Sequence, residues 1–262
     1  MRERSLGFVV VLTICLVGGS SVLAVTGYSV NSDGDGQLYA IDLNTGVAAP
    51  IGPVGFSDVE GLSFHPVTGV LYGVDDITEQ LITINLATGA GTPVGALGVG
   101  IVDMGLTFDA AGNLWMATDV PATFYSINPA TGAAAAVGPQ GQFVTGLAAS
   151  GHTVYGLGGD FVNNLVTINT ATGATTPVGA LGAGLNVTDG GIDFDNAGVL
   201  WGIEDGGNIF TINPVTGAGT VISGTLSGFE SLAIQQTVIP EPATLVLLGL
   251  SAVGFVLRRR RR

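Results

Sequence analysis

The sequence predicts an all-β protein, a five-bladed β-propeller whose four-stranded antiparallel blades are closed into a ring by the C-terminal strand. Three observations support this fold: the glycine content, a unit that occurs five times, and the phase at which that unit begins and ends. Glycine accounts for 43 of 262 residues, whereas aromatic residues make up 7%. Glycine at this frequency favours short strands joined by tight turns over helices.

The repeat is clearest in a strand that alternates apolar and polar residues and ends in Asn/Asp-x-x-Thr-Gly. Its final glycines fall at positions 46, 89, 132, 173 and 217, so successive repeats are 43, 43, 41 and 44 residues apart. Glycine provides the left-handed turn, and Asn or Asp bonds the nearby backbone. The five copies are LYAIDLNTG (38–46), LITINLATG (81–89), FYSINPATG (124–132), LVTINTATG (165–173) and IFTINPVTG (209–217).

Three further strands accompany this one, and four strands in a repeat of this length are typical of a propeller blade. Counting outward from the axis, we name them A (such as GLSF, 61–64), B, C (the Thr-Gly strand) and D (such as GTPVGAL, 91–97). The B strands carry aromatic residues that we expect to pack between blades: Tyr28, Tyr72, Trp115, Tyr155 and Trp201. The units broadly resemble the YVTN class of exported propellers. A parallel β-solenoid is the alternative, although its repeats are typically shorter.

The phase of the repeat predicts how the ring closes. The chain begins with the B strand around Tyr28 and ends with an A strand at 231–234, which is the strand that the first unit lacks. We therefore expect the last strand to complete the first blade and to remove the open sheet edge. Residues 25–237 are assigned to this propeller.

The N-terminus has the layout of a secretory signal peptide with its helix. Residues 1–24 contain Arg2 and Arg4, an apolar stretch from 6 to 17, and small residues leading to Ala24, after which signal peptidase is expected to cut. Cys15, the single cysteine, lies within the apolar stretch. The mature protein is therefore expected to have neither disulfides nor cysteine metal ligands.

The C-terminus, residues 238–262, forms a second targeting segment. A Pro-Glu-Pro motif precedes a 15-residue apolar run at 243–257 and a basic end; these residues are Pro240, Glu241, Pro242, Arg258, Arg259, Arg260, Arg261 and Arg262. This order resembles the PEP-CTERM sorting signal of bacterial surface proteins. The resemblance implies a transmembrane helix, a cytoplasmic arginine anchor, recognition by an exosortase, cleavage near the motif, and a final location at the cell surface or outside the cell. An ordinary membrane anchor is the alternative, but the run is short against the ~20 residues of a spanning helix.

The charge distribution argues against nucleic acid as a partner. The chain has no lysine, and its seven arginines all lie at residues 2, 4 and 258–262. Of its 20 acidic residues, only Glu3 and Glu241 lie outside the central region, which therefore holds 18 carboxylates and no formal cation. Because phosphate binding draws on lysine and arginine, metal cations or basic partners fit this region better. Solubility alone is the alternative reason for such acidity.

Strand order gathers most of the acids on one end of the predicted propeller. The B–C and D–A loops emerge on what we call the first face, and the A–B and C–D turns on the second face. The D–A loops are predicted to place five acids around the mouth of the central channel, where a cation such as calcium would relieve their repulsion. These candidate ligands are Asp58, Glu60, Asp103, Asp189 and Glu230.

The first B–C hairpin, NSDGDG at 31–36, offers three more candidate calcium ligands, Asn31, Asp33 and Asp35. Their spacing follows that of a calcium-binding loop. An EF-hand is excluded, because the segment joins two strands and Asp42 belongs to a Thr-Gly turn. An acidic hairpin without metal is the alternative, since Asp-Gly pairs also serve ordinary turns.

Taken together, these features predict an exported, non-catalytic protein of the cell surface or extracellular matrix. Its acidic face would bind cations, exopolysaccharide through calcium, or another surface protein. A calcium-dependent hydrolase or lactonase with metal in the channel is the alternative. No Gly-x-Ser-x-Gly nucleophile motif occurs in the chain, and no cofactor other than calcium is expected.

Overall fold

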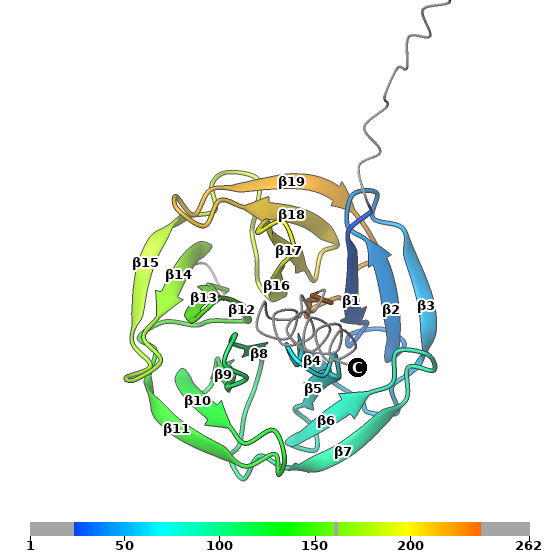
Figure 1. Cartoon of the computed structure of the whole chain (residues 1–262). Helices are drawn as coiled ribbons and strands as arrows, with labels where there is room; N and C mark the ends of the chain where they lie inside the picture. The colour runs from blue at the N-terminus through cyan, green and yellow to red at the C-terminus, as the bar shows by residue number, and fades with distance from the viewer. Residues whose placement is uncertain (1–23, 160–161, 237–262) are drawn as a thin grey trace, which may run out of the picture.

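Five four-stranded antiparallel sheets are arranged around a central axis (Figure 1). The structure is a computed structural model that describes residues 24–159 and 162–236. The prediction of an all-β, five-bladed propeller is confirmed. Within the described ranges no helix is long and apolar enough to cross a membrane. The predicted signal helix and C-terminal transmembrane helix lie outside these ranges.

Each blade contributes four strands, which follow one another from the axis outward. Blade 1 contains β20 (Ala233–Ile234), β1 (Thr26–Val30), β2 (Gln37–Asp42) and β3 (Ala48–Pro53). Blade 2 contains β4 (Val59–Phe64), β5 (Leu71–Asp75), β6 (Gln80–Ile84) and β7 (Gly91–Ala96). Blade 3 contains β8 (Met104–Phe108), β9 (Leu114–Thr118), β10 (Thr123–Ile127) and β11 (Ala134–Pro139). Blade 4 contains β12 (Gly146–Ser150), β13 (Thr153–Leu157), β14 (Asn164–Ile168) and β15 (Thr175–Ala180). Blade 5 contains β16 (Gly190–Phe194), β17 (Leu200–Glu204), β18 (Asn208–Ile212) and β19 (Gly219–Gly224).

The outermost strand of every blade is bent by a bulge. The register between the C and D strands shifts once in each blade. In blade 2, for example, Leu81 pairs with Gly95 but Ile82 pairs with Pro93, which leaves Val94 as the extra residue. Bulges increase the local twist of a strand, so the D strands curve along the rim of the ring (Figure 1).

The ring is closed by the last strand, as the phase of the repeat predicts. Strand β20 pairs antiparallel with β1, where Ala233 lies opposite Tyr28. A further bridge joins Asn31 to Phe229. The innermost strand of blade 1 is therefore supplied by the far end of the chain.

The hydrophobic core is divided into five clusters, one between each pair of neighbouring blades. The cluster between blades 5 and 1 is an example of how side chains from two neighbouring sheets pack together. Phe229 is fully buried and packs edge-on against Tyr39, with ring centroids 5.3 Å apart. Trp201 of blade 5 belongs to the same cluster. Because each blade buries both of its faces, the stability of the ring depends on contacts between sheets.

The B-strand aromatic residues pack between blades, as the sequence predicts. In three blades a B-strand tyrosine contacts the A-strand phenylalanine of the next blade, with ring centroids 5.2 to 5.5 Å apart. These pairs are Tyr28–Phe64, Tyr72–Phe108 and Tyr155–Phe194. The indole N–H groups of the two tryptophans also donate hydrogen bonds to aspartate carboxylates. Nε1 of Trp115 donates to Asp109 at 3.2 Å, and Nε1 of Trp201 donates to Asp195 at 2.9 Å.

Neighbouring blades also meet at a ring of glycine pairs near the rim. The glycine of each Thr-Gly turn has a φ between 77° and 81°, which favours glycine. A Cβ atom there would lie 1.8 to 2.5 Å from the carbonyl oxygen of a D-strand glycine in the preceding blade. The pairs are Gly46–Gly224, Gly89–Gly52, Gly132–Gly95, Gly173–Gly138 and Gly217–Gly179. Backbone therefore touches backbone at each blade boundary, which explains why Thr-Gly recurs in the sequence.

Candidate functional site

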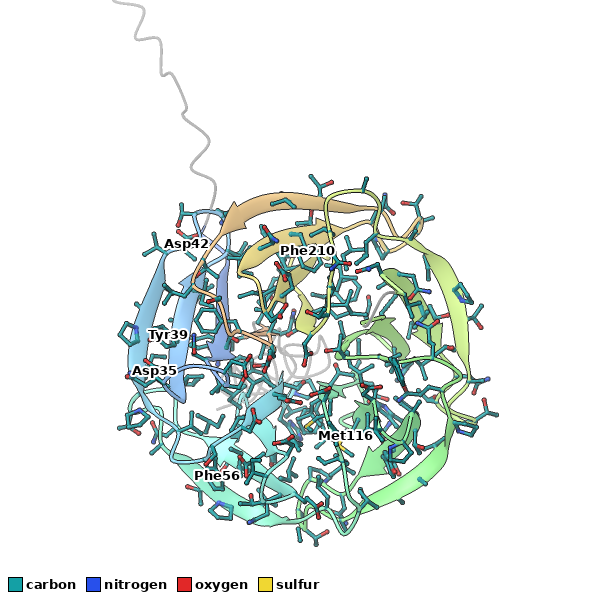
Figure 2. The ribbon with its side chains drawn as sticks, turned by 180° about the vertical axis from the view of Figure 1, so that it is seen from behind. Asp35, Tyr39, Asp42, Phe56, Met116 and Phe210 are labelled. Carbon is teal, nitrogen blue, oxygen red and sulfur yellow. The ribbon has the colours of Figure 1, made fainter. Side chains whose placement is uncertain are left out.

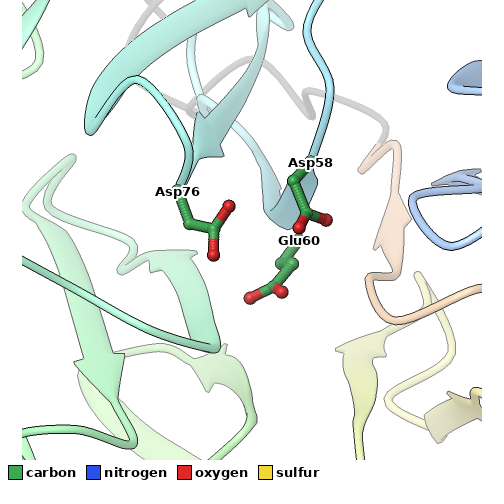
Figure 3. A group of neighbouring side chains, drawn as sticks. All are labelled: Asp58, Glu60 and Asp76. Atoms are coloured by element: carbon green, nitrogen blue, oxygen red, sulfur yellow. The ribbon is translucent and has the colours of Figure 1, made fainter.

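Acidic side chains from several blades converge at the first-face end of the axis. Two groups have carboxylate oxygens within 4.8 Å of one another: Asp58, Glu60 and Asp76 form the first, and Glu60, Asp103 and Asp189 form the second. Figure 3 shows the first group, in which Asp58 and Glu60 come from the start of blade 2 and Asp76 comes from the β5–β6 loop of the same blade. Glu60 belongs to both groups and so connects them. With Glu230, whose charge acts on Glu60, we call these residues the carboxylate mouth: Asp58, Glu60, Asp76, Asp103, Asp189 and Glu230.

Glu60 owes its position to an irregularity in the innermost strand. It lies within β4, and not in the loop before that strand as the sequence suggested. The register between β4 and β5 shifts between Val59 and Gly61, so Glu60 is an extra residue in a bulge. Its Oε2 accepts the N–H of Met104 at 3.0 Å, which links the A strands of blades 2 and 3.

Two acids of the mouth, Glu60 and Asp189, bind protons much more tightly than usual. Burial, with added repulsion from Asp189 and Asp103, raises the pKa of Glu60 to about 10. Burial, with repulsion from Glu230 and Asp103, raises the pKa of Asp189 to about 8. Without a cation, both carboxyl groups therefore favour the protonated form far more than an ordinary carboxyl group does.

Three other members of the mouth show smaller shifts in the same direction. Burial raises the pKa of Glu230 to about 7, although Ser32 opposes this by donating a hydrogen bond to Oε2 at 2.7 Å. Burial and the charge of Asp58 raise the pKa of Asp76 to about 6. The pKa of Asp58 is also raised, by burial and then by the charge of Asp33. The whole mouth thus carries unfavourable negative charge when it is fully ionised.

The 31–36 hairpin does not direct its three candidate ligands to one point. The Nδ2 atom of Asn31 donates to the carbonyl of Ser227 at 2.9 Å. Asp35 accepts a hydrogen bond from the hydroxyl of Tyr39 at 2.8 Å, and both residues lie away from the centre of the ring (Figure 2). Asp33 is the member whose negative charge raises the pKa of two acids of the mouth, Asp58 and Glu230.

Two other acids of the first face are held by their own hairpins. Asp75 is fully buried and accepts the backbone N–H groups of Asp58 at 3.0 Å and Thr78 at 2.9 Å. Glu204 occupies the same place in blade 5 and accepts the N–H of Gly206 at 2.8 Å. These carboxylates stabilise turns and are not members of the mouth.

Asp76 and Thr145 were not among the candidate ligands drawn from the sequence. Asp76 follows Asp75 in the B–C loop, and its N–H donates to the carbonyl of Asp58 at 3.1 Å. Its place in the B–C loop directly after Asp75, on the face where the acids gather, is the sequence signal that would have identified it. Thr145 bonds the carboxylate of Asp189 and accepts the N–H of Gly190 at 3.0 Å. No pattern in the sequence distinguishes this threonine from its neighbours.

The axis below the mouth is nearly filled by the inner strands. The axial cavity lined by Glu60, Met104, Thr145 and Glu230 has a volume of about 10 Å³, which is room for about one water molecule. The mouth is therefore a shallow acidic basin and not the entrance of an open channel. A separate cavity of about 320 Å³ lies at the other end of the axis, on the second face.

The donor set of the mouth suits a hard divalent cation. Calcium binds carboxylate oxygens at 2.3–2.6 Å, so oxygens on opposite sides of one ion lie about 5 Å apart. The spacing within both groups, at most 4.8 Å, meets this requirement. Between residues 5 and 257 the chain has no lysine or arginine that could neutralise these acids instead.

Comparisons with known proteins agree with the fold and with the C-terminal segment. Residues 238–262 match the PEP-CTERM protein-sorting motif. The predicted sorting residues Pro240, Glu241, Pro242 and Arg258 to Arg262 fall within this match and outside the described residues. No curated protein matches the sequence.

Solved structures with a similar fold share little sequence with this chain. A chain from a nidogen/laminin complex has a TM-score of 0.54 and 15% identity, with 78% of this chain and 80% of that chain covered. A structural genomics protein of unknown function from Bacteroides thetaiotaomicron has a TM-score of 0.49 and 16% identity, with 64% of this chain and 54% of that chain covered. At such identities the first likeness supports the fold alone. The protein thus joins a five-bladed β-propeller to a C-terminal PEP-CTERM sorting motif.

Proposed function

We propose that this is an exported, non-catalytic protein of the cell surface or extracellular matrix whose carboxylate mouth binds a divalent cation, calcium being the first candidate. The observation that carries the proposal is that two groups of carboxylates, each with oxygens within 4.8 Å of one another, share Glu60 in a region without lysine or arginine. A cation placed there lowers the energy of burying these charges. Its remaining coordination positions can be filled by water or by oxygens of a partner.

The sorting motif supports the location and the processing partners. It implies export and processing by an exosortase, and the layout of residues 1–24 supports earlier cleavage by signal peptidase. Once at the surface, the bound cation would bridge the mouth to exopolysaccharide or to an acidic patch of another surface protein. Nucleic acid is not a suitable partner, because the propeller has no basic surface.

Calcium titration of the purified full-length chain tests the proposed site. We expect saturable heat in calorimetry and a rise in melting temperature, equivalent to about 2.7 kcal/mol when calcium reaches 100 times its Kd. Glu60→Gln should abolish both effects, because Glu60 belongs to both carboxylate groups. Glu79→Gln is the matched control: it makes the same chemical change on the same face of blade 2, at an exposed residue outside the groups.

Two results would contradict the proposal. A protein whose heat signal and melting temperature ignore millimolar calcium has no such site. Equal losses of calcium binding in Glu60→Gln and Glu79→Gln would show that calcium responds to the general acidity of the face and not to the mouth.

A calcium-dependent hydrolase or lactonase is the second candidate. The observation that favours it is that burial raises the pKa of Glu230, which lies outside both carboxylate groups, to about 7, a value near the working pH that general acid–base catalysis requires. Hydrolysis of simple ester or lactone substrates that needs calcium and disappears in Glu60→Gln and Glu230→Gln would favour this candidate over a non-catalytic role.

A further inference from the structure

Both ends of the described propeller leave from the second face, opposite the carboxylate mouth. The chain passes from Glu230 on the first face through β20 to Gln236, which lines the 320 Å³ cavity on the second face. At the other end of the chain, Val25 precedes β1 and accepts the N–H of Leu43, beside a C–D turn. The chain therefore enters and leaves through the same end of the ring.

Gln236 lies close to the axis and not at the rim. The cavity that it lines is formed by the ends of the innermost strands, including Phe64 and Phe194. Its side-chain Nε2 bonds the carbonyl of Phe194. A segment that follows Gln236 thus starts near the middle of the second face.

The connection from this point to the apolar run of the sorting segment is short. Six residues, 237–242, separate Gln236 from Ala243. Even fully extended, they span at most about 25 Å. The second face must therefore stay close to whatever surface holds residues 243–257.

The propeller is too large to turn over on such a tether. To reach around the ring, the tether would first cross three strand spacings from the axis to the rim, about 14 Å. It would then pass along a blade wall of five or six residues, roughly another 17–20 Å. This path exceeds the available length, so the first face cannot meet the surface to which the tail is attached.

We propose that the chain is tethered through its second face, so that the carboxylate mouth points away from the membrane and is offered to positively charged ligands outside the cell. This inference rests on the membrane attachment that the sorting motif implies and deepens the proposed function. It excludes the membrane itself as the partner of the mouth. It also means that the mouth is accessible before the tail is processed.

Paired cysteine substitutions in blade 2 provide the test. Ile77 and Val67 are 66% and 70% exposed and lie on opposite faces, in the B–C and A–B turns of the same blade. The full chain is reconstituted into lipid vesicles as Ile77→Cys or Val67→Cys and treated with a maleimide carrying a large polyethylene glycol. The same proteins in detergent give the reference rates, and the unsubstituted chain gives the background from Cys15.

We expect the two variants to react at similar rates in detergent. In vesicles, the rate for Ile77→Cys should stay unchanged, whereas the rate for Val67→Cys should fall several-fold because the membrane blocks the large reagent. Equal slowing of both variants, no slowing of either, or slowing of Ile77→Cys alone would overturn the proposal. Calcium binding is not part of this readout. If only Val67→Cys is slowed in vesicles but calcium does not bind, the cation site is rejected and the proposed orientation stands. If calcium binds but the two variants do not differ in this way, only the orientation is rejected.

Discussion

At the scale of the residue, pairs of glycines allow the backbones of neighbouring blades to come into contact. The Thr-Gly turn of each blade places a glycine with positive φ against the backbone of a glycine in the preceding D strand. At four of the five boundaries both partners must be glycine, because a Cβ on either one would collide with a carbonyl oxygen. At the fifth boundary, only the Thr-Gly partner, Gly46, has this requirement. The repeated Thr-Gly sequence is thus required both by the turn within each blade and by the contact between neighbouring blades.

Gly89→Ala tests this contact, and Gly55→Ala serves as its control. Their φ angles are 78° and 80°, but a Cβ at Gly89 would lie 2.2 Å from the carbonyl oxygen of Gly52, whereas Gly55 has nothing within 4 Å. Gly55→Ala should cost about 1–2 kcal/mol of unfolding free energy through backbone strain alone. Gly89→Ala should cost a further 1–3 kcal/mol or so through overpacking.

Thermal unfolding measures the difference, since about 1 kcal/mol shifts the melting temperature of a domain of this size by some 2–4 °C. Equal melting temperatures for the two variants would show that the blades can separate at the rim without loss of stability.

At the scale of the element, strand β20 holds the ring closed with few backbone bonds and many side-chain contacts. The strand is only two residues long. The residues before it compensate: Asn31 donates to the carbonyl of Ser227, Ser32 donates to Glu230, and Phe229 fills the cluster between blades 5 and 1. Side-chain packing therefore stabilises the closed ring at least as much as the backbone pairing of β20 with β1 does.

Phe229→Ala should accordingly destabilise the protein by about 3–5 kcal/mol, the usual cost of removing a buried phenylalanine. Phe229 is 0% exposed. Phe143→Ala is the matched control, because Phe143 is 38% exposed on the first face and its loss should cost less than about 1 kcal/mol. Chemical denaturation of both variants checks this. A small effect at Phe229 would mean that the ring stays folded without a packed closure.

At the scale of the whole molecule, acidic charge is unevenly spread and unbalanced. The mouth gathers six carboxylates, and no lysine or arginine occurs between residues 5 and 257. Folding buries part of this charge, so the folded state holds protons that the unfolded chain releases. The stability of the propeller should therefore depend on pH and on cations together.

Without divalent cations, the free energy of unfolding should fall as the pH rises from about 5 to 9. The folded-state pKa values of Asp76, Glu230, Asp189 and Glu60 are about 6, 7, 8 and 10, above the ~4 of unfolded carboxyl groups. The folded state thus binds more protons than the unfolded state in this range, and stability declines with pH. The charges that act on Glu60 are those of Asp76, Asp103, Asp189 and Glu230, all of them negative, so they strengthen the trend.

Melting temperatures between pH 5 and 9, measured with a chelator and with calcium, check this dependence. Calcium and Glu60→Gln should each flatten the decline. A residual slope should remain near pH 7, because burial raises the pKa of Asp193 to about 7 on the second-face side of the axis. Stability that rises with pH in the chelator would contradict the burial of these acids.

The number of blades and the closure of the ring could be predicted, because both follow from repeat spacing and phase. The Thr-Gly glycines count the blades, and the A-type strand at the end of the chain can only complete the first blade. The candidate site was predicted less fully. Asp58, Asp103, Asp189 and Glu230 precede A strands and could be placed near the axis, but the bulge that carries Glu60 depends on register. The direction of Asp35 depends on its bond to Tyr39, which spacing alone does not reveal.

The position of β20 ties the integrity of the ring to the place where the tail is removed. Ile234 ends the last strand, and the match to the sorting motif begins four residues later. Trimming at Pro240–Pro242 would leave every blade complete, whereas a cut before Ala233, seven residues before Pro240, would separate β20 from the rest of the propeller. During synthesis and export one edge of β1 must likewise stay unpaired until Ala233 and Ile234 emerge. The maturation signal and the last piece of the fold therefore arrive together.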